Sequence, residues 1–480
     1  PSRMAPAGRM SGSAWSAAED FGMRLRTRDR AQLTRLTGEA RRRWASGGVR
    51  GMRGTGSGRL RGAITPGTPA VGALMSLNVE TDNACSTFDT RIGRVVAVGT
   101  RLIVIADTMN PAGGLSAADY QALADSFDTF IYPVATANFD VPSDIDGNGG
   151  RVIAFFTRAV NELTPSGSST VNDGFFLNRD LFPATTCPTS NIGEMFYLMA
   201  ADPSGTVNGN VRGVSDVKER AQRTMAHELE HMINAGRRLY VNTSPSGDVD
   251  FEEAWLDEGL ARISTELVFY NRSGTAPGAN LGAAALGVPA AQDAFFRYMY
   301  DTFGQLRAWM RAPHADGSFQ LAADSATQGV SWAFLRYAAD RKGGTQSATW
   351  RALVNTTATG VPNLAAALGT DPFPWYRDFA GAMYADDAGL SPLAVYTMPS
   401  WNFRELYANL DFTPGPACSC AFELAVRPLA NGVADSFTLA VGGAAYLRFG
   451  VPANAFAGLR VLSGSAAPPS TVRMLVIRTR

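Results

Sequence analysis

The chain has 480 residues, 45% of them hydrophobic, and its 43 basic and 43 acidic residues give a formal net charge of zero. This length predicts two or three domains with ample buried core. The balanced charge argues against nucleic acid or an anionic membrane as a partner, and no apolar run is long enough for a membrane-spanning helix.

Residues 1–65 differ in composition from the rest of the chain. Apolar residues at helical spacing between Leu33 and Trp44 predict an arginine-studded amphipathic helix, followed by a Gly/Arg-rich linker over 47–56. We expect an N-terminal arm or propeptide remnant, and whether it inhibits the rest stays open. The chain begins at Pro1 without a hydrophobic export segment, so we expect that a signal peptide has been removed or left out.

Strand patterns begin near residue 70. The predicted elements are strands at 73–79, 94–98 and 102–106, a helix from Ala117 to Tyr132, and a buried strand at 151–157.

The loop before that last strand carries Asp144, Asp146 and Asn148 at alternate positions, with Gly149 sixth. This resembles the start of a calcium loop, but Phe155 occupies the twelfth position, where a bidentate glutamate belongs. Two interpretations stay open: a Ca²⁺ site, and a structural turn that enters the strand.

A short apolar run at 194–200 predicts a further strand. Peptidase substrates often bind by adding a strand to a sheet edge, and this run is the best candidate for such an edge. A central core strand fits the same residues equally well.

Two of only three histidines in the chain lie in His227-Glu228-Leu229-Glu230-His231. On a helix, positions four apart share a face, so both imidazoles can reach one metal ion, with Glu228 placed to act on water. The flanks predict a helix capped by Ser215 and ended by Gly236. The motif predicts a zinc peptidase site.

A hydrolytic zinc site usually has a third protein ligand. Arg237 stands six residues after His231, where one large class has its third histidine, so that class is excluded. The segment Trp255-Leu-Asp-Glu258-Gly-Leu260 matches a pattern in which another group of zinc peptidases carries a glutamate ligand. Glu258 is therefore the predicted third ligand, and its rivals are the preceding Glu252 and Glu253.

Carboxylates also commonly hold the free N–H of metal-bound histidines. Asp257, Glu252 and Glu266 are candidates for this role, and the sequence does not choose among them.

Together with Asp144–Gly149, these two motifs resemble the hyicolysin-type bacterial zinc metallopeptidases over roughly residues 70–337. The resemblance implies an α+β gluzincin catalytic domain in which a small sheet packs on the metal helix and a mostly helical half follows. It also implies that His227, His231 and Glu258 bind Zn²⁺ and that Glu228 is catalytic. Export to the periplasm or the extracellular space rests mainly on the same resemblance.

The expected reaction is hydrolysis of a peptide bond, with Glu228 as general base and a second electrophile beside zinc for the oxyanion. The candidates for that electrophile are His314, Tyr270, Tyr298, Tyr300 and Tyr337. None is singled out. In aminopeptidase relatives a tyrosine precedes a glycine by three residues in a helix that resembles 328–330, but Ala326 occupies that position here.

The type of peptidase follows from a further comparison with aminopeptidases. Aminopeptidases hold the amine of the substrate with a glutamate. Phe196 occupies the corresponding position here, so an endopeptidase is favoured. An aminopeptidase on the same scaffold and a non-catalytic binding protein are the alternatives.

Helical patterns dominate from about Ala290 to Tyr384, with 331–337 as a core helix, and strand patterns return after about Pro414. These patterns predict three parts: the arm over 1–65, a catalytic domain over 66–400, and a small C-terminal β-sandwich over 415–480. The role of the sandwich is open. We expect a monomer that acts on protein or peptide substrates.

The chain has four cysteines, in contexts that suit an oxidising compartment. Cys85 and Cys187 both lie in turn-rich stretches of the catalytic domain and are candidates for a disulfide. Cys418 and Cys420 either form a tight bridge or stay reduced.

Overall fold

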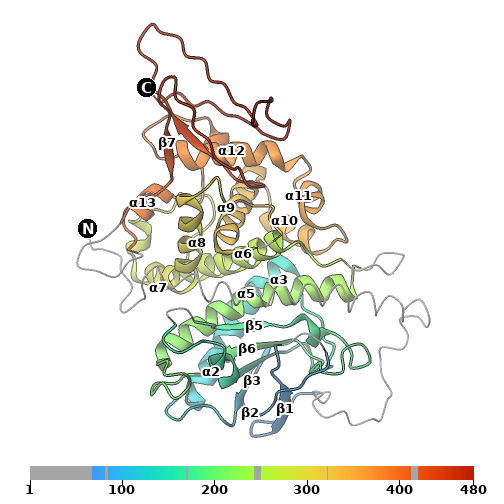
Figure 1. Ribbon diagram of the computed structural model, residues 1–480. Coiled ribbons are helices and arrows are strands. Elements are labelled where there is room, and N and C mark those ends of the chain that lie inside the picture. The colour runs from blue at the N-terminus through green and yellow to red at the C-terminus, as the bar shows by residue number, and fades with distance from the viewer. Residues whose placement is uncertain are drawn as a thin grey trace, which may run out of the picture.

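The computed structural model of the protein describes residues 67–81, 85–168, 171–242, 250–321, 323–411 and 420–479. Within these residues a long helix, α5 (Val214–Tyr240), lies between a sheet half and a helical half (Figure 1). This mixture of sheet and helices is compatible with the predicted α+β class. The predicted arm over residues 1–65 lies outside the described residues.

The sheet half contains a six-stranded mixed sheet with the order β1-β2-β3-β4-β6-β5. Its strands are β1 (Leu74–Asn78), β2 (Thr90–Val98), β3 (Leu102–Asp107), β4 (Val152–Thr157), β5 (Gly174–Phe176) and β6 (Met195–Met199). β3, β4 and β6 run parallel, and every residue of β4 and β6 is buried. Strands buried on both faces read as continuous apolar runs, which explains the strong sequence signals for these two.

The run at 194–200 corresponds to β6, which pairs with β4 on one side and β5 on the other. It is therefore a central strand, and the alternative interpretation of this run as the sheet edge is wrong. The edge next to α5 is β5, a strand of three residues that the sequence analysis did not identify.

Three helical segments follow one another before β4. They are α2 (Ala117–Ser126), a π-helical turn η3 (Phe127–Ile131) and α3 (Tyr132–Phe139). A capping box at Ser116 and Asp119 starts this run, which extends beyond the predicted end at Tyr132. α2 contacts β2 and β3, while α5 contacts β5 and β6.

Helix α5 has the predicted buried stripe, including Val217, Leu229 and Ile233, but its ends differ from the prediction. Gly213, not Ser215, is the N-cap, and the helix continues past Gly236 to Tyr240. A Cβ on residue 236 would lie 2.7 Å from Ser143 Oγ. The glycine therefore permits close packing of the loop before β4, instead of ending the helix.

The second half of the chain is mostly helical, as predicted. Its long helices are α6 (Ala254–Ser273), α7 (Pro289–Tyr298), α8 (Tyr300–Arg311), α9 (Ser325–Lys342), α10 (Gln346–Val354), α11 (Gly360–Leu368) and α12 (Pro372–Ala385). Besides η3, the short helices in the described part of the chain are α4 (Arg158–Glu162), η4 (Asn178–Leu181), η5 (Ala285–Gly287), η6 (Ala394–Tyr396) and α13 (Phe403–Tyr407). The predicted core helix at 331–337 is part of α9 and is buried throughout. Each helix of the described residues is too short or too polar to cross a bilayer.

The C-terminal segment, residues 420–479, contains one sheet of two parallel strands, β7 (Val426–Pro428) and β8 (Tyr446–Arg448). The β-sandwich predicted over 415–480 is absent from these described residues. A sandwich needs an apolar face covered by a second sheet, yet Val441, Phe456 and Val476 are exposed. The first part of the segment packs against α8 and α12, for example through the Tyr446 hydroxyl, which donates to the Ala380 carbonyl at 2.9 Å.

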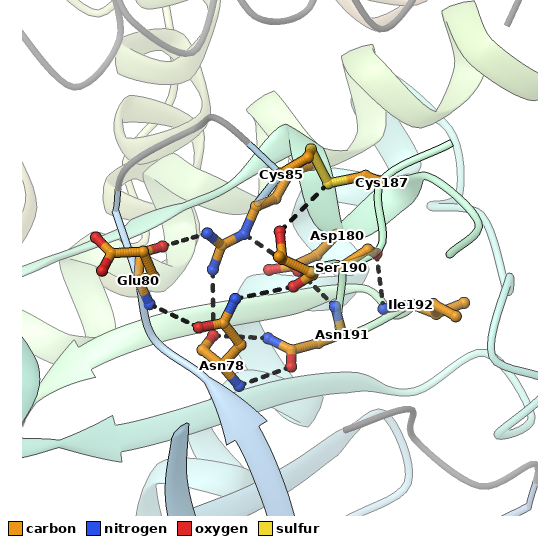
Figure 2. The surroundings of a disulfide bond; sticks show 10 residues. Asn78, Glu80, Cys85, Asp180, Cys187, Ser190, Asn191 and Ile192 are labelled. Carbon is orange, nitrogen blue, oxygen red and sulfur yellow. Dashed lines mark hydrogen bonds and ion pairs between the residues drawn. A yellow bond between two sulfur atoms is a disulfide. The ribbon is translucent and has the colours of Figure 1, made fainter. Parts of the chain in front are cut away.

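A disulfide joins Cys85 to Cys187, which confirms that predicted pair. Figure 2 shows it beside a buried hydrogen-bond network around Asn78, Asp180 and Asn191. The Asn78 backbone N–H donates to the Asn191 side-chain oxygen at 2.9 Å, and the Asn191 backbone N–H donates to the Asp180 carboxylate at 2.8 Å. The network ties the end of β1 to the loop before β6. The choice between a Cys418–Cys420 bridge and reduced cysteines involves residue 418, which lies outside the described residues.

Candidate metal centre

Helix α5 presents His227 and His231 on one face, one turn apart, as their spacing predicts. Their Nε2 atoms lie 3.2 Å apart and their rings are nearly perpendicular, at 82°. Both side chains are buried. The two imidazoles therefore point at one small volume beside α5.

Glu258 on α6 completes this group. Its Oε2 lies 3.4 Å from His227 Nε2, and its Oε1 lies 4.0 Å from His231 Nε2. One ligand atom from each of the three residues falls within 4.8 Å of the other two. The helices cross here because small residues allow close contact: the Ser264 hydroxyl of α6 donates to the Ala226 carbonyl of α5 at 2.7 Å.

The rival carboxylates are engaged elsewhere. Glu252 forms an ion pair with Arg238 at 2.7 Å and accepts the Gly360 N–H. Glu253 accepts the indole N–H of Trp255 at 2.8 Å. The structure thus brings Glu258, and not these two, to the histidines.

Two buried nitrogens and one buried carboxylate oxygen that converge in this way fit a zinc ion, which prefers imidazole and carboxylate ligands in tetrahedral sites. The histidines differ in their surroundings. Burial lowers the pKa of His227 well below its usual value, and the Arg262 guanidinium lowers it further. Burial acts in the same direction on His231, but Asp257, Glu258 and Glu228 outweigh it and raise its pKa to about 10.

Among the three candidates for a carboxylate behind the histidines, the structure selects Asp257. Its Oδ2 lies 3.0 Å from His231 Nδ1, and its Oδ1 accepts from the Asn234 amide at 3.1 Å. Glu230 also faces this nitrogen, at 3.9 Å. An imidazole held this way at Nδ1 directs its Nε2 toward Glu258 and His227.

Glu228 lies at the junction of α5 and the sheet edge. It is buried, and its Oε2 accepts the backbone N–H of Phe176 in β5 at 3.2 Å. This contact orients the carboxylate between the metal-ligand group and the edge strand. Because a three-residue strand has almost no sequence signature, the sequence did not indicate this contact of Phe176 with Glu228.

Each residue considered as the second electrophile has a specific partner outside the metal-ligand group. The His314 ring packs against Phe437 of the C-terminal segment. The hydroxyls of the four tyrosines donate to Glu266 (Tyr270), Gln222 (Tyr298), the Asp411 carbonyl (Tyr300) and the Val395 carbonyl (Tyr337). Ala326 is in the first turn of α9.

The Asp144–Gly149 loop is separate from this centre. Asp146 accepts the Asn148 backbone N–H at 3.0 Å and the Asn148 amide at 2.8 Å, and the Asn148 side chain accepts the Arg151 N–H at 2.7 Å. These bonds describe a turn that enters β4. A Ca²⁺ ion at Asp144, Asp146 and Asn148 stays a prediction.

No family model matches the chain. A stretch of 145 residues is 30% identical to the neutral metalloprotease ShpI of Staphylococcus hyicus. The stretch spans 30% of this chain and 30% of that protein, so it covers under a third of either. The similarity supports a metallopeptidase relationship and, through it, a bound metal. It does not define a narrower family.

Proposed function

We propose that the protein is an exported, zinc-dependent endopeptidase in which His227, His231 and Glu258 hold the metal and Glu228 transfers protons. The observation that carries this proposal is the convergence of three buried ligand atoms within 4.8 Å of one another. The partial similarity to a metalloprotease is consistent with it. The disulfide between Cys85 and Cys187 supports an oxidising location.

The edge strand offers a place for the substrate backbone. β5 is the terminal strand of the sheet order and contacts α5, so an extended peptide that pairs with it would run along the metal helix. The Phe176 N–H to Glu228 bond connects this edge directly to the proposed base. An extended, edge-bound peptide suits cleavage within a chain, which favours an endopeptidase.

In the proposed reaction Glu228 removes a proton from water as the water oxygen bonds to the scissile carbonyl carbon. The C–N bond then breaks, and Glu228 gives the proton to the leaving amine nitrogen. A bound zinc ion supplies Lewis acidity that polarises the carbonyl and makes water more acidic. Asp257 holds the His231 ring in the orientation that this geometry requires.

The test is cleavage of quenched fluorescent casein by the wild type and by Glu228→Gln, with zinc measured in both. We expect one zinc per chain in each protein and a loss of activity of about 10²–10⁴-fold or more in the variant, since it lacks the general base. Glu219→Gln, on the same helix two turns earlier, is the matched control and should cleave normally. Zinc-loaded wild type that cleaves no peptide bond would refute the proposed activity, and absence of zinc from both proteins would refute the ligand set.

A further inference from the structure

Arg262 is a cationic side chain beside the proposed metal ligands that the sequence analysis did not consider. It follows Glu258 by four residues on α6, and residues at this spacing share a helix face. Glu258 on that face lies 3.4 Å from His227 Nε2. The arginine therefore lies on the metal side of α6.

A chain of amide side chains from two further helices positions this guanidinium. Arg262 Nη2 donates to Gln328 Oε1 of α9 at 2.8 Å. The same oxygen accepts from Gln305 of α8 at 2.9 Å, and the Gln328 amide donates to the Ala323 carbonyl at 3.3 Å. Both glutamines are buried, so Arg262 is held by a rigid support.

Gly329 explains why α8 and α9 approach closely enough for this support. A Cβ at this position would lie 2.3 Å from the Leu306 backbone nitrogen of α8. Only glycine allows that contact without a shift of the helices. The close approach places Gln328 beside Gln305. It also explains the Gln328-Gly329 pair by helix packing, although this pair superficially resembles an aminopeptidase motif.

We propose that Arg262 is a catalytic residue whose guanidinium donates to the scissile carbonyl oxygen as that oxygen becomes negatively charged. This inference rests on the proposed peptidase function and supplies its missing electrophile, since His314 and the four candidate tyrosines contact other groups. Arginine suits the task because it stays charged and presents several N–H donors in one plane. Donors fixed before the reaction stabilise such an oxyanion most effectively.

The experiment compares Arg262→Gln and Arg262→Lys with Arg272→Gln, a matched control on the same helix whose guanidinium lies over the Phe130 ring. The substrate is an internally quenched peptide blocked at both ends. We expect Arg262→Gln to lower kcat by about 10²–10³-fold with a much smaller change in KM. Arg262→Lys should recover part of the loss, and all proteins should keep one zinc per chain.

A second readout is independent of turnover. A phosphinic peptide, which resembles the tetrahedral transition state, should bind zinc-loaded Arg262→Gln more weakly by a factor similar to the loss in kcat, and bind the control normally. Unchanged kcat, a loss confined to KM, or unchanged phosphinic peptide affinity would overturn the role of Arg262. A loss seen only with peptides that have a free C-terminal carboxylate would also overturn it, because the arginine would then bind that carboxylate.

The two proposals fail in distinguishable ways. If the wild type holds zinc and cleaves nothing, the proposed function is wrong, and phosphinic peptide binding still decides whether Arg262 faces a tetrahedral oxyanion. If the wild type cleaves and Glu228→Gln does not, while Arg262→Gln is fully active, only the proposal about Arg262 is wrong.

Discussion

The helical half and the loop before β4 in the sheet half keep buried carboxylates by different means, whereas Asp180 elsewhere in the sheet half lies 3.6 Å from Arg179. In the helical half an arginine accompanies each of two buried glutamates: Glu252 lies 2.7 Å from Arg238, and Glu266 lies 2.9 Å from Arg336. Glu266 also accepts the indole N–H of Trp401 at 2.6 Å. A buried ion pair with its remaining oxygens hydrogen-bonded is a structural unit.

The sheet half buries Asp146 and Glu194 near each other without this arrangement. Asp146 accepts its bonds from Asn148, and Glu194 accepts the Ile145 N–H at 3.2 Å. Burial is the main reason that the pKa of Asp146 rises to about 7, and Glu194 adds to it. Burial likewise raises the pKa of Glu194.

Glu258 belongs to neither kind, because it faces two imidazoles. It shares α6 with Glu266, so helix and burial alone do not distinguish a proposed ligand from a structural carboxylate. The partner does. An arginine neutralises a carboxylate permanently, whereas an imidazole can give up its proton when a metal ion binds and leave the carboxylate charge available to that ion.

The largest expected effect comes from Glu258→Gln, which tests this distinction directly. The change preserves side-chain size but removes the anionic ligand, so zinc affinity should fall by more than about 100-fold, the upper range for outer-shell changes. Activity should fall to the level of metal-free protein. Zinc per chain by elemental analysis and affinity by chelator competition measure the effect.

Glu253→Gln is the control for that substitution, because Glu253 lies five residues earlier and binds Trp255. It should leave zinc affinity unchanged. Equal zinc binding by Glu258→Gln and the wild type would show that the glutamate is not a ligand.

Glu266→Gln should affect stability instead of metal binding. It removes one of the two carboxylates that pair with the buried Arg336 and leaves Asp340 at 3.2 Å, so we expect a loss of about 3 kcal/mol, the lower end of the range for a broken buried ion pair. Urea denaturation measures this loss, and the folded fraction should still hold one zinc. In the double variant Glu266→Gln/Arg336→Met the loss should be smaller, since the guanidinium that lost the Glu266 carboxylate is gone and Asp340 keeps its hydrogen bonds from Ser400 and Gln346. A double variant as unstable as the single one would contradict the ion-pair explanation.

The sequence predicted the features that depend on local spacing. The position of His227 and His231 on one helix face was predicted from helical periodicity alone, and Glu258 was predicted from the residues next to it in the sequence. Asp257 could not be chosen over Glu252 and Glu266, because the choice depends on how α6 is rotated against α5. The structure resolves it through the 3.0 Å contact with His231.

Features that depend on packing between segments far apart in the chain were not predicted from the sequence. Arg262 lies beside His227 only because α6 crosses α5, and its support comes from α8 and α9. The C-terminal sandwich is not confirmed in the described residues, for a related reason. Alternating apolar residues, such as those near Val441, indicate an extended chain but do not show whether a second sheet covers it.

Asp146→Asn has the smallest expected effect and tests the sheet half. The pKa of Asp146 is about 7 in the folded protein, against an ordinary value of 3.8. Between these values the folded protein binds a proton that the unfolded chain has released. The free energy of unfolding should therefore decrease as pH rises from about 4 to about 7, and level off above 7.

This one group should account for up to about 4 kcal/mol of that decrease, since each tenfold change in proton affinity is worth about 1.4 kcal/mol. The variant lacks the titrating carboxyl, so the difference between the two stability–pH curves isolates its contribution. Parallel curves from pH 4 to 8 would contradict the raised pKa.

Adding Ca²⁺ at pH 8 sharpens the test. If Asp144, Asp146 and Asn148 form a calcium loop, bound Ca²⁺ would raise the melting temperature of the wild type and not of the variant. If Ca²⁺ changes neither, the loop is a structural turn whose buried acid is kept neutral by a proton below about pH 7, in contrast to the arginine-paired acids of the helical half.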